Sequence, residues 1–206
     1  MTHYSFGSVC QLLGVPASFM RKLEYPQLAA INLQHMTNKV ARKDIKVLQT
    51  ASEEANASQQ IRAVTSSSYG RIWDEEIVRL ILENVDLDRW KVPSASYASK
   101  NAKLASTLYA SDRDIFLWLV DEENPVEVPG ANGVDTMFRG FLASNSETGN
   151  GVALFSQFLY RESCDNRLLY GVKMEQNVRI RHTSGAPHRF REELAPAMLQ
   201  SQIEDP

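Results

Sequence analysis

The sequence predicts an α+β fold in a single domain, residues 1–206, in which N-terminal helices pack beside a largely antiparallel mixed sheet. Three observations lead to this class. The length of 206 residues suits one substantial core. Apolar residues recur at helical spacing in the first 38 residues, whereas short apolar stretches between turn residues follow from about residue 103. A content of 43% hydrophobic and 23% charged residues excludes a largely disordered chain.

The N-terminal part, residues 1–38, is expected to hold three helices. Residues 5–13 carry apolar side chains at helical spacing, and Gly14 ends this helix. Pro16 suits the first position of a second helix that runs to about Leu23. Pro26 begins a third, whose expected buried side consists of Leu28, Ile31, Leu33 and Met36.

Between residues 39 and 92 the chain alternates between polar and apolar stretches. Residues 45–48 and 61–64 are strand-like, and the Ser-, Asn- and Gln-rich residues 51–60 indicate an exposed loop. Residues 73–84 form an amphipathic helix with acidic residues in its first turn, where the helix dipole favours them. Its expected apolar face consists of Trp73, Ile77, Leu80 and Ile81.

The second half is expected to be mainly β. Residues 103–109 and 114–120 form a hairpin around 111–113, and residues 136–143, 168–174 and 177–182 are further strands. Residues 115–120 are apolar on both faces, which places them centrally in a covered sheet. Residues 123–133 hold two prolines and two glycines and are expected to be an irregular connector. Residues 152–160 fit either a strand or a buried helix, and residues 187–202 form a C-terminal helix that is interrupted at Pro196.

Several classes of protein are excluded or disfavoured. No apolar run approaches the roughly 20 residues of a membrane helix, and the N-terminus lacks a secretion signal, so we expect a cytoplasmic protein. Cys10 and Cys164 make neither a disulfide framework nor a C-x-x-C zinc motif. No catalytic or dinucleotide-binding signature is present, so we expect no cofactor and favour a binding protein over an enzyme.

Polar motifs in a fixed order resemble a known family. They are Arg62-Ala63-Val64 with Tyr69, Asp112-Arg113-Asp114, Arg139-Gly140-Phe141, Asn145-Ser146-Glu147 with Gly149, Arg161 with Cys164 and Asn166, and Arg181-His182-Thr183. This series resembles the phage/plasmid-like family, a "domain of unknown function" of bacteriophages and plasmids, over roughly residues 61–183. The resemblance implies that the protein comes from a mobile genetic element, and it implies no particular reaction.

The leading functional hypothesis is nucleic-acid binding in DNA metabolism. Residues 161–191 hold seven Lys or Arg against three acids, although the chain as a whole has a net charge of −3. The residues expected to contact phosphates are Arg161, Arg167, Lys173, Arg179, Arg181 and Arg189, with Tyr170 and Phe190 stacking on unpaired bases. In a subsidiary form of the hypothesis, residues 9–21 are a helix-turn-helix whose Ser18, Arg21 and Lys22 face the DNA major groove.

Two other hypotheses remain open. Asp114, Glu147 and His182 are the residue types of a metal-dependent enzyme that acts on nucleic acid, and Cys164 with His182 is a possible nucleophile and base. Buried arginine–carboxylate pairs, such as Arg139 with Glu147, would explain the same residues structurally. Alternatively, the chain is an interaction protein that inhibits a host system or forms homo-oligomers.

Overall fold

The computed structural model describes residues 2–39, 44–50, 59–92, 108–130, 133–160, 169–171 and 177–201. The chain divides into two compact units, Met1–Tyr69 and Gly70–Pro206. Both hold helices, and every strand pair in the described residues is antiparallel, so the predicted α+β class is confirmed. That residues 1–206 form a single domain stays a prediction. Within the described ranges, no helix has the length and apolar character needed to cross a membrane.

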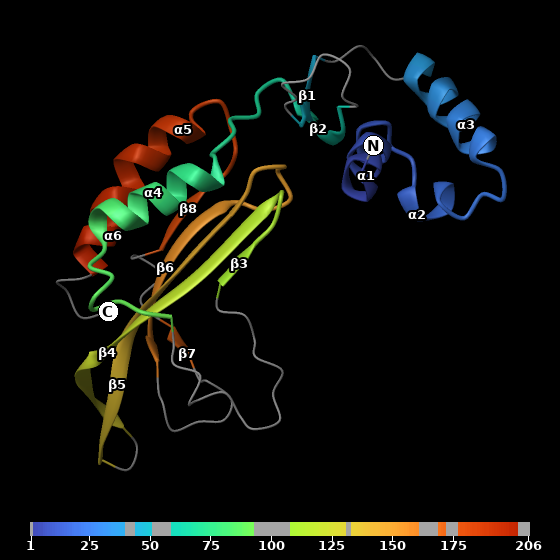
Figure 1. Ribbon diagram of the computed structural model, residues 1–206. Coiled ribbons are helices and arrows are strands. Elements are labelled where there is room, and N and C mark those ends of the chain that lie inside the picture. The colour runs from blue at the N-terminus through green and yellow to red at the C-terminus, as the bar shows by residue number, and fades with distance from the viewer. Residues whose placement is uncertain are drawn as a thin grey trace. The chain divides into compact units, whose positions relative to one another are not determined.

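In the part of the first unit that the structure describes there are three helices and a two-stranded sheet, which Figure 1 labels α1 to α3, β1 and β2. The hydroxyl of Thr2 accepts a hydrogen bond from the Ser5 amide at 3.0 Å and caps the first helix. Cys10, Met20 and Ala29 form the buried core. The elements are α1 (His3–Leu12), α2 (Ala17–Met20), α3 (Pro26–Lys39), β1 (Ile45–Gln49) and β2 (Ile61–Ser66).

Two expectations for this unit are wrong in detail. The second helix is a single turn rather than a run to Leu23. In α3, Leu28 and Ile31 are exposed, because the side that meets the core consists of Ala29 and the partly buried Leu33. The predicted loop at 51–60 falls mostly outside the described residues.

The second unit is built on a sheet with the strand order β3-β4-β5-β6-β7. The strand β8 pairs with the first half of β6, while β7 pairs with its second half. Residues 153–160 are therefore a strand, which decides between the two alternatives left open by their apolar pattern. The strands are β3 (Leu108–Ala110), β4 (Asp114–Gly130), β5 (Gly133–Ser146), β6 (Ala153–Tyr160), β7 (Leu169–Gly171) and β8 (Val178–Ile180).

β4 and β5 form a long hairpin that extends beyond the helices (Figure 1). The irregular connector expected at 123–133 is thus wrong. A bulge separates the pair Asp121–Arg139 from the pair Pro125–Phe138. The buried carboxylate of Asp121 organises the bulge, because it accepts hydrogen bonds from the amides of Glu123 and Asn124, both at 3.2 Å. Beyond the bulge the ladder resumes and continues to the pair Gly130–Gly133.

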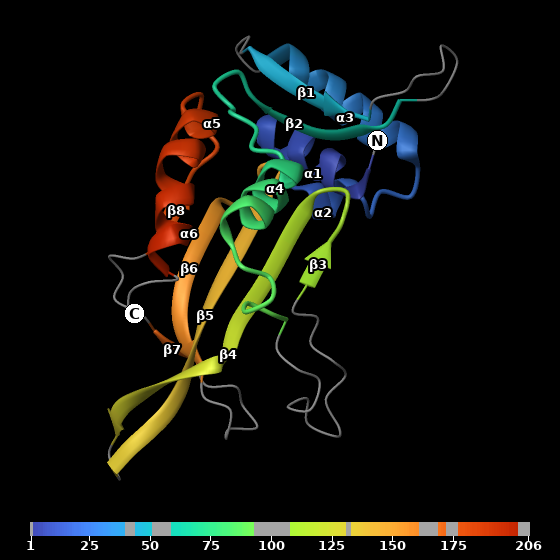
Figure 2. The ribbon, with the colours of Figure 1, turned by 60° about the vertical axis from the view of Figure 1, so that its left-hand side comes forward.

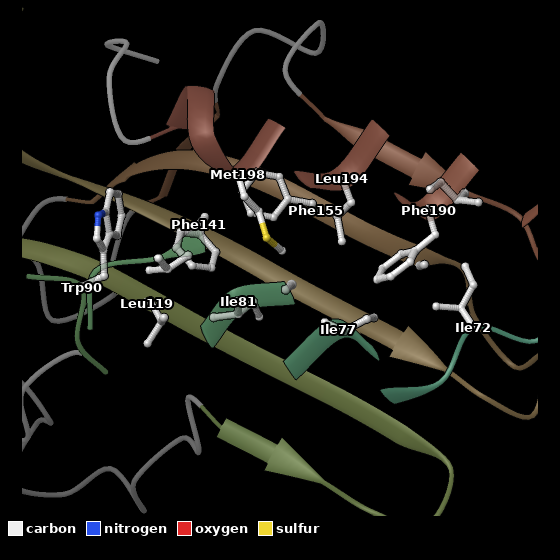
Figure 3. Packing of buried hydrophobic residues seen from close by; sticks show 14 of the residues in the cluster. Ile72, Ile77, Ile81, Trp90, Leu119, Phe141, Phe155, Phe190, Leu194 and Met198 are labelled. Atoms are coloured by element: carbon white, nitrogen blue, oxygen red, sulfur yellow. The ribbon is translucent and has the colours of Figure 1, made fainter. Parts of the chain in front are cut away.

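Helices cover one face of this sheet, which we call the helix-covered face (Figures 1 and 2). They are α4 (Asp74–Asn84), α5 (Ala186–Arg189), the π-helical turn η3 (Phe190–Leu194) and α6 (Ala195–Ser201). Ile77 and Ile81 from α4 meet Phe141 and Phe155 from the sheet (Figure 3). Each such side chain contributes about 1.5–3 kcal/mol when fully buried, so this layer is the main core of the unit.

The C-terminal helix passes through Pro196 without the predicted interruption. Proline has no amide hydrogen and its ring clashes with the carbonyl four residues earlier in a regular α-helix. Here the π-helical turn over Phe190–Leu194 precedes the proline and changes the hydrogen-bond register there. The helix is therefore widened locally instead of being broken.

Candidate nucleic-acid interface

The sheet face opposite the helices, which we call the outer face, carries one row of residues that crosses the sheet. Strand pairing places Tyr109 opposite Phe116, Phe116 opposite Ser144, Ser144 opposite Leu154, and Leu154 opposite Arg179. Residues directly opposite each other in antiparallel strands share a face. The row therefore runs from two aromatic rings at one edge of the sheet to a guanidinium at the other.

Exposure changes along the outer face. Val120 and Phe158 are buried, and the ring of Phe158 lies over Gly140 and packs edge-on against Trp118, with centroids 5.2 Å apart. Two rows nearer the end of the sheet, Tyr109 is 48% exposed and Arg179 is also exposed, while Phe116, Ser144 and Leu154 between them are partly buried. The exposed side chains of the row are therefore those at its two ends, Tyr109 and Arg179.

Among the basic residues from the sequence prediction, Arg179 projects from the outer face, and Arg181 follows it just beyond the end of β8. Both are exposed, and within the described part of the chain neither forms an ion pair. Ile180 between them is fully buried on the helix-covered face. This alternation fixes the side on which Arg179 projects.

The other predicted basic residues divide into two groups. Arg189 forms two hydrogen bonds with Glu193, at 2.7 and 2.9 Å, which raise the pKa of the Arg189 guanidinium. This contact within the helix satisfies the charge of Arg189, and the i, i+4 spacing of Arg189 and Glu193 is the sequence signal that could have revealed it. Arg161, Arg167 and Lys173 lie outside the described residues.

One of the two predicted stacking residues is wrong. Phe190 is 2% exposed, because it lies in the core between the C-terminal helix and the sheet (Figure 3), so it cannot reach a base. The side chain of Tyr170 falls outside the described residues, although its backbone is part of β7. Tyr109 and Phe116 were missed as stacking residues, since only the strand register shows that they are adjacent.

Glu147 belongs to a cluster at the start of α4 instead of a catalytic group. Its carboxylate forms an ion pair with the guanidinium of Arg71 and accepts a hydrogen bond from the Asp74 amide at 2.9 Å. Asn145 adds bonds to the Ile72 carbonyl at 2.9 Å and to the Asp74 carboxylate at 2.7 Å. These contacts tie the end of β5 to the segment that leads into α4.

The ion pair of Glu147 differs from the one suggested by the sequence. Arg139 lies eight residues earlier on the same strand, about 26 Å away at the normal strand rise. Arg71 takes its place from a segment 76 residues away in the chain. Separation in sequence of this size gives no local signal, which is why Arg71 was not predicted.

His182 lies beside the same segment. Its Nδ1 atom is 3.1 Å from the Gly70 carbonyl, and the Gly70 amide donates to the His182 carbonyl at 3.2 Å. A Cβ atom on residue 70 would lie 2.0 Å from the Thr183 carbonyl oxygen, so only glycine fits this close approach. Desolvation by burial lowers the pKa of His182, against a smaller opposing effect of the Gly70 hydrogen bond.

The proposed catalytic residues do not form one group. Asp114 lies opposite Ser146 on the outer face, whereas Glu147 contacts α4 and His182 contacts Gly70. In the part of the chain that the structure describes, no three His, Cys, Asp or Glu side chains gather to hold a metal ion. Cys164 lies outside that part.

The helix-turn-helix interpretation of residues 9–21 does not agree with the structure. The second helix, α2, has four residues, which is too short to lie along a major groove as a recognition helix does. Arg21 donates to the His3 carbonyl at 2.8 Å and its guanidinium lies over the Phe6 ring, so this side chain joins α1 to the turn after α2.

Trp73 differs most from its predicted place. It was expected on the buried face of its helix but is 48% exposed, because it precedes the first turn of α4. Its ring carries the Arg71 guanidinium, 3.5 Å from the ring centroid. An exposed, cation-stacked indole beside the Glu147 cluster is thus a second surface feature of this unit.

Comparison with known proteins adds no relationship to this geometry. No family model matches the chain, and neither curated proteins nor solved structures give a match. Functional inference therefore depends on the residues themselves.

Proposed function

We propose that this protein binds single-stranded nucleic acid on the outer face of its sheet. The observation that carries the proposal is the row from Tyr109 and Phe116 to Arg179, which has an exposed aromatic ring at one end, a partly buried ring beside it and an exposed guanidinium at the other end. Aromatic side chains stack on unpaired bases of any sequence, at about 1–3 kcal/mol per base. Arginines neutralise phosphates in the same strand.

The composition of the row favours a single strand over a duplex. Bases that are paired and stacked within a duplex do not offer their ring faces to a protein surface, whereas those of a single strand do. A net charge of −3 also disfavours a purely electrostatic mode of binding. The resemblance to phage and plasmid proteins is the ground for placing this activity in the DNA metabolism of a mobile element.

Fluorescence anisotropy with labelled single-stranded and double-stranded DNA of one mixed sequence tests the proposal. We expect tighter binding to the single strand, and Tyr109→Ala should weaken it by about 1–3 kcal/mol. Tyr109→Phe keeps the ring and should bind as the wild type does. Equal affinity for both forms of DNA, or an unchanged affinity of Tyr109→Ala, would contradict the proposal.

The salt dependence of binding tests the basic end of the row. Each phosphate contact on a single strand contributes about −0.7 to the slope of log affinity against log salt. Arg179→Ala with Arg181→Ala should therefore make the slope less steep by about 1.4. Arg79→Ala is the matched control, since Arg79 is an exposed arginine on α4, and it should leave the slope unchanged.

A further inference from the structure

Trp73 presents a partly exposed aromatic ring at the surface. The side chain is 48% exposed, whereas Trp90, the other tryptophan in this layer, is 1% exposed. The Arg71 guanidinium covers one face of the indole, 3.5 Å from its centroid. About half of this cation-stacked side chain is therefore exposed.

Trp73 contacts one arginine through its ring and is linked to a second arginine through its backbone amide. Glu147 and its hydrogen bond from the Asp74 amide fix the guanidinium of Arg71 behind the indole. The Trp73 amide donates to Glu76 at 3.3 Å, and Arg191 donates to the other oxygen of the same carboxylate at 3.1 Å. Arg71 thus stacks on the ring itself, whereas Arg191 is joined through Glu76 to the backbone amide of Trp73. A ring that is already braced by a stacked side chain loses less entropy when a ligand binds.

We propose that the exposed indole of Trp73 is a stacking platform for an unpaired nucleobase, with Arg191 as the contact for its phosphate. A base has a flat ring that can stack on the exposed indole, and a phosphate can form a charge-assisted hydrogen bond with an exposed guanidinium. The Arg191 side chain is 69% exposed, so its ion pair with Glu76 can exchange for a phosphate at little cost.

The platform would bind a further nucleotide of the strand that the outer-face row binds, so this inference rests on the proposed function. Hydrogen bonds join the segment around Trp73 to the strands that carry the row. Ser144 of the row lies three residues before Glu147, which binds the amide next to Trp73. On the other edge, Arg179 lies three residues before His182, which binds Gly70, three residues before Trp73.

Tryptophan fluorescence gives a direct test in the full-length chain. Trp118 neighbours the outer-face row, so Trp118→Phe leaves the exposed Trp73 and the buried Trp90 as emitters. We expect oligothymidylate to quench the emission of this variant, with saturation at the concentration found by anisotropy. Trp73→Phe in the same background should show no quenching.

Affinity gives a second and independent readout. Trp73→Ala should weaken binding about tenfold, whereas Trp73→Phe, which retains an aromatic ring, should stay within about twofold of the wild type. Leu82→Ala removes another exposed apolar side chain from α4 and should bind normally. Arg191→Gln should make the salt slope less steep by about 0.7, and Arg79→Gln should not change it.

The outcomes separate this inference from the proposed function. If Tyr109→Ala weakens binding while Trp73 is not quenched and Trp73→Ala binds normally, the platform is overturned and the outer-face site stands. If Trp73 is quenched and Trp73→Ala binds weakly while Tyr109→Ala binds normally, the platform stands and the outer-face site is overturned. Absence of any binding by the wild-type chain overturns both.

Discussion

Gly140 shows how a single residue permits the packing of the outer face. The Phe158 ring crosses directly over it, and a Cβ atom there would lie 2.1 Å from Cε2 and 2.3 Å from Cζ of that ring. Phe158 is itself confined by its edge-on contact with Trp118. The ring therefore cannot move aside without losing its own contacts.

Gly140→Ala should lower the free energy of unfolding by about 2–3 kcal/mol, because overpacking forces the Phe158 ring out of its site. Urea denaturation followed by circular dichroism measures the change. Gly151→Ala is the matched control, since its Cβ atom would meet Ser146 at an ordinary 3.6 Å, and it should stay within about 0.5 kcal/mol of the wild type. Equal stability of the two variants would show that Phe158 does not occupy the space above Gly140.

His182 is the residue whose ionisation should affect stability. Desolvation lowers its pKa in the folded state below the ordinary value of 6.5, so the unfolded chain binds the proton more readily. Stability is then greatest above pH 6.5 and falls as the pH decreases from 6.5 to the folded pKa, since the unfolded state holds more protons in that window.

His182→Gln should lose this part of the pH dependence, which equilibrium unfolding at neutral and mildly acidic pH would measure. On acidification, the free energy of unfolding should fall less for the variant than for the wild type. His35→Gln, an exposed histidine on α3, serves as the control and should follow the wild-type profile. A wild-type profile for His182→Gln as well would contradict the burial of this ring.

At the scale of elements, the C-terminal helix is defined by the spacing of its buried residues. Ala186, Phe190, Leu194 and Met198 occur every four residues, and each is at most 2% exposed. In a regular α-helix this spacing rotates the apolar stripe by about 40° at each step. The wider π-helical turn over Phe190–Leu194 reduces that rotation, which keeps all four side chains against the sheet.

Pro196→Ala tests whether the proline or the buried residues determine the π-helical turn. In a regular helix interior this change would stabilise the protein by about 3 kcal/mol. We expect a change of about 1 kcal/mol or less, because a return to α-helical register would rotate Phe190, Leu194 or Met198 out of the core at about 2–5 kcal/mol each. Chemical denaturation measures it, and a gain near 3 kcal/mol would show that the proline alone maintains the turn.

The elements that could be predicted from sequence are those whose signals are local. The apolar spacing of Ile77 and Ile81 located α4, and the turn at 111–113 located the hairpin of β3 and β4. The bulge after Asp121 could not be predicted, because it depends on a buried carboxylate that gathers amides from the segment folding around it. Prolines and glycines in that segment were instead interpreted as an irregular connector.

The candidate site was harder to predict, for a physical reason. Arg179 was identified because its alternation with the apolar Ile180 is visible in sequence. The pairing of Tyr109 with Phe116 depends on strand register, and the pairing of Arg71 with Glu147 joins residues far apart in the chain. Phe190 was misassigned, since an aromatic residue on a helix looks the same in sequence whether it stacks on a base or fills a core.

At the scale of the second unit, the far part of the β4–β5 hairpin presents a strand edge that must resist pairing with another copy. From Val126 to Gly130, no other described strand pairs with β4 on its free side. Pro125 and Pro129 are four positions apart, so their backbone nitrogens point to the same side of β4. Because proline has no amide hydrogen to donate, it is found in sheets where its nitrogen points away from the paired strand. The free edge of β4 therefore lacks two of the amide hydrogens that could pair with another strand. Glu127, between the two prolines, adds a charge that also opposes such pairing.

Replacing both prolines should expose this edge and promote self-association. Pro125→Val with Pro129→Val restores two outward amides and raises strand propensity, so we expect dimers or larger assemblies that increase with protein concentration. Sedimentation velocity on the full-length chain measures the change. Thr136→Val raises strand propensity on the partner strand without adding a donor to β4, and it should sediment as the wild type does. If both variants keep the wild-type profile, the prolines do not protect this edge, and the charge of Glu127 or the twist of the hairpin would have to account for it.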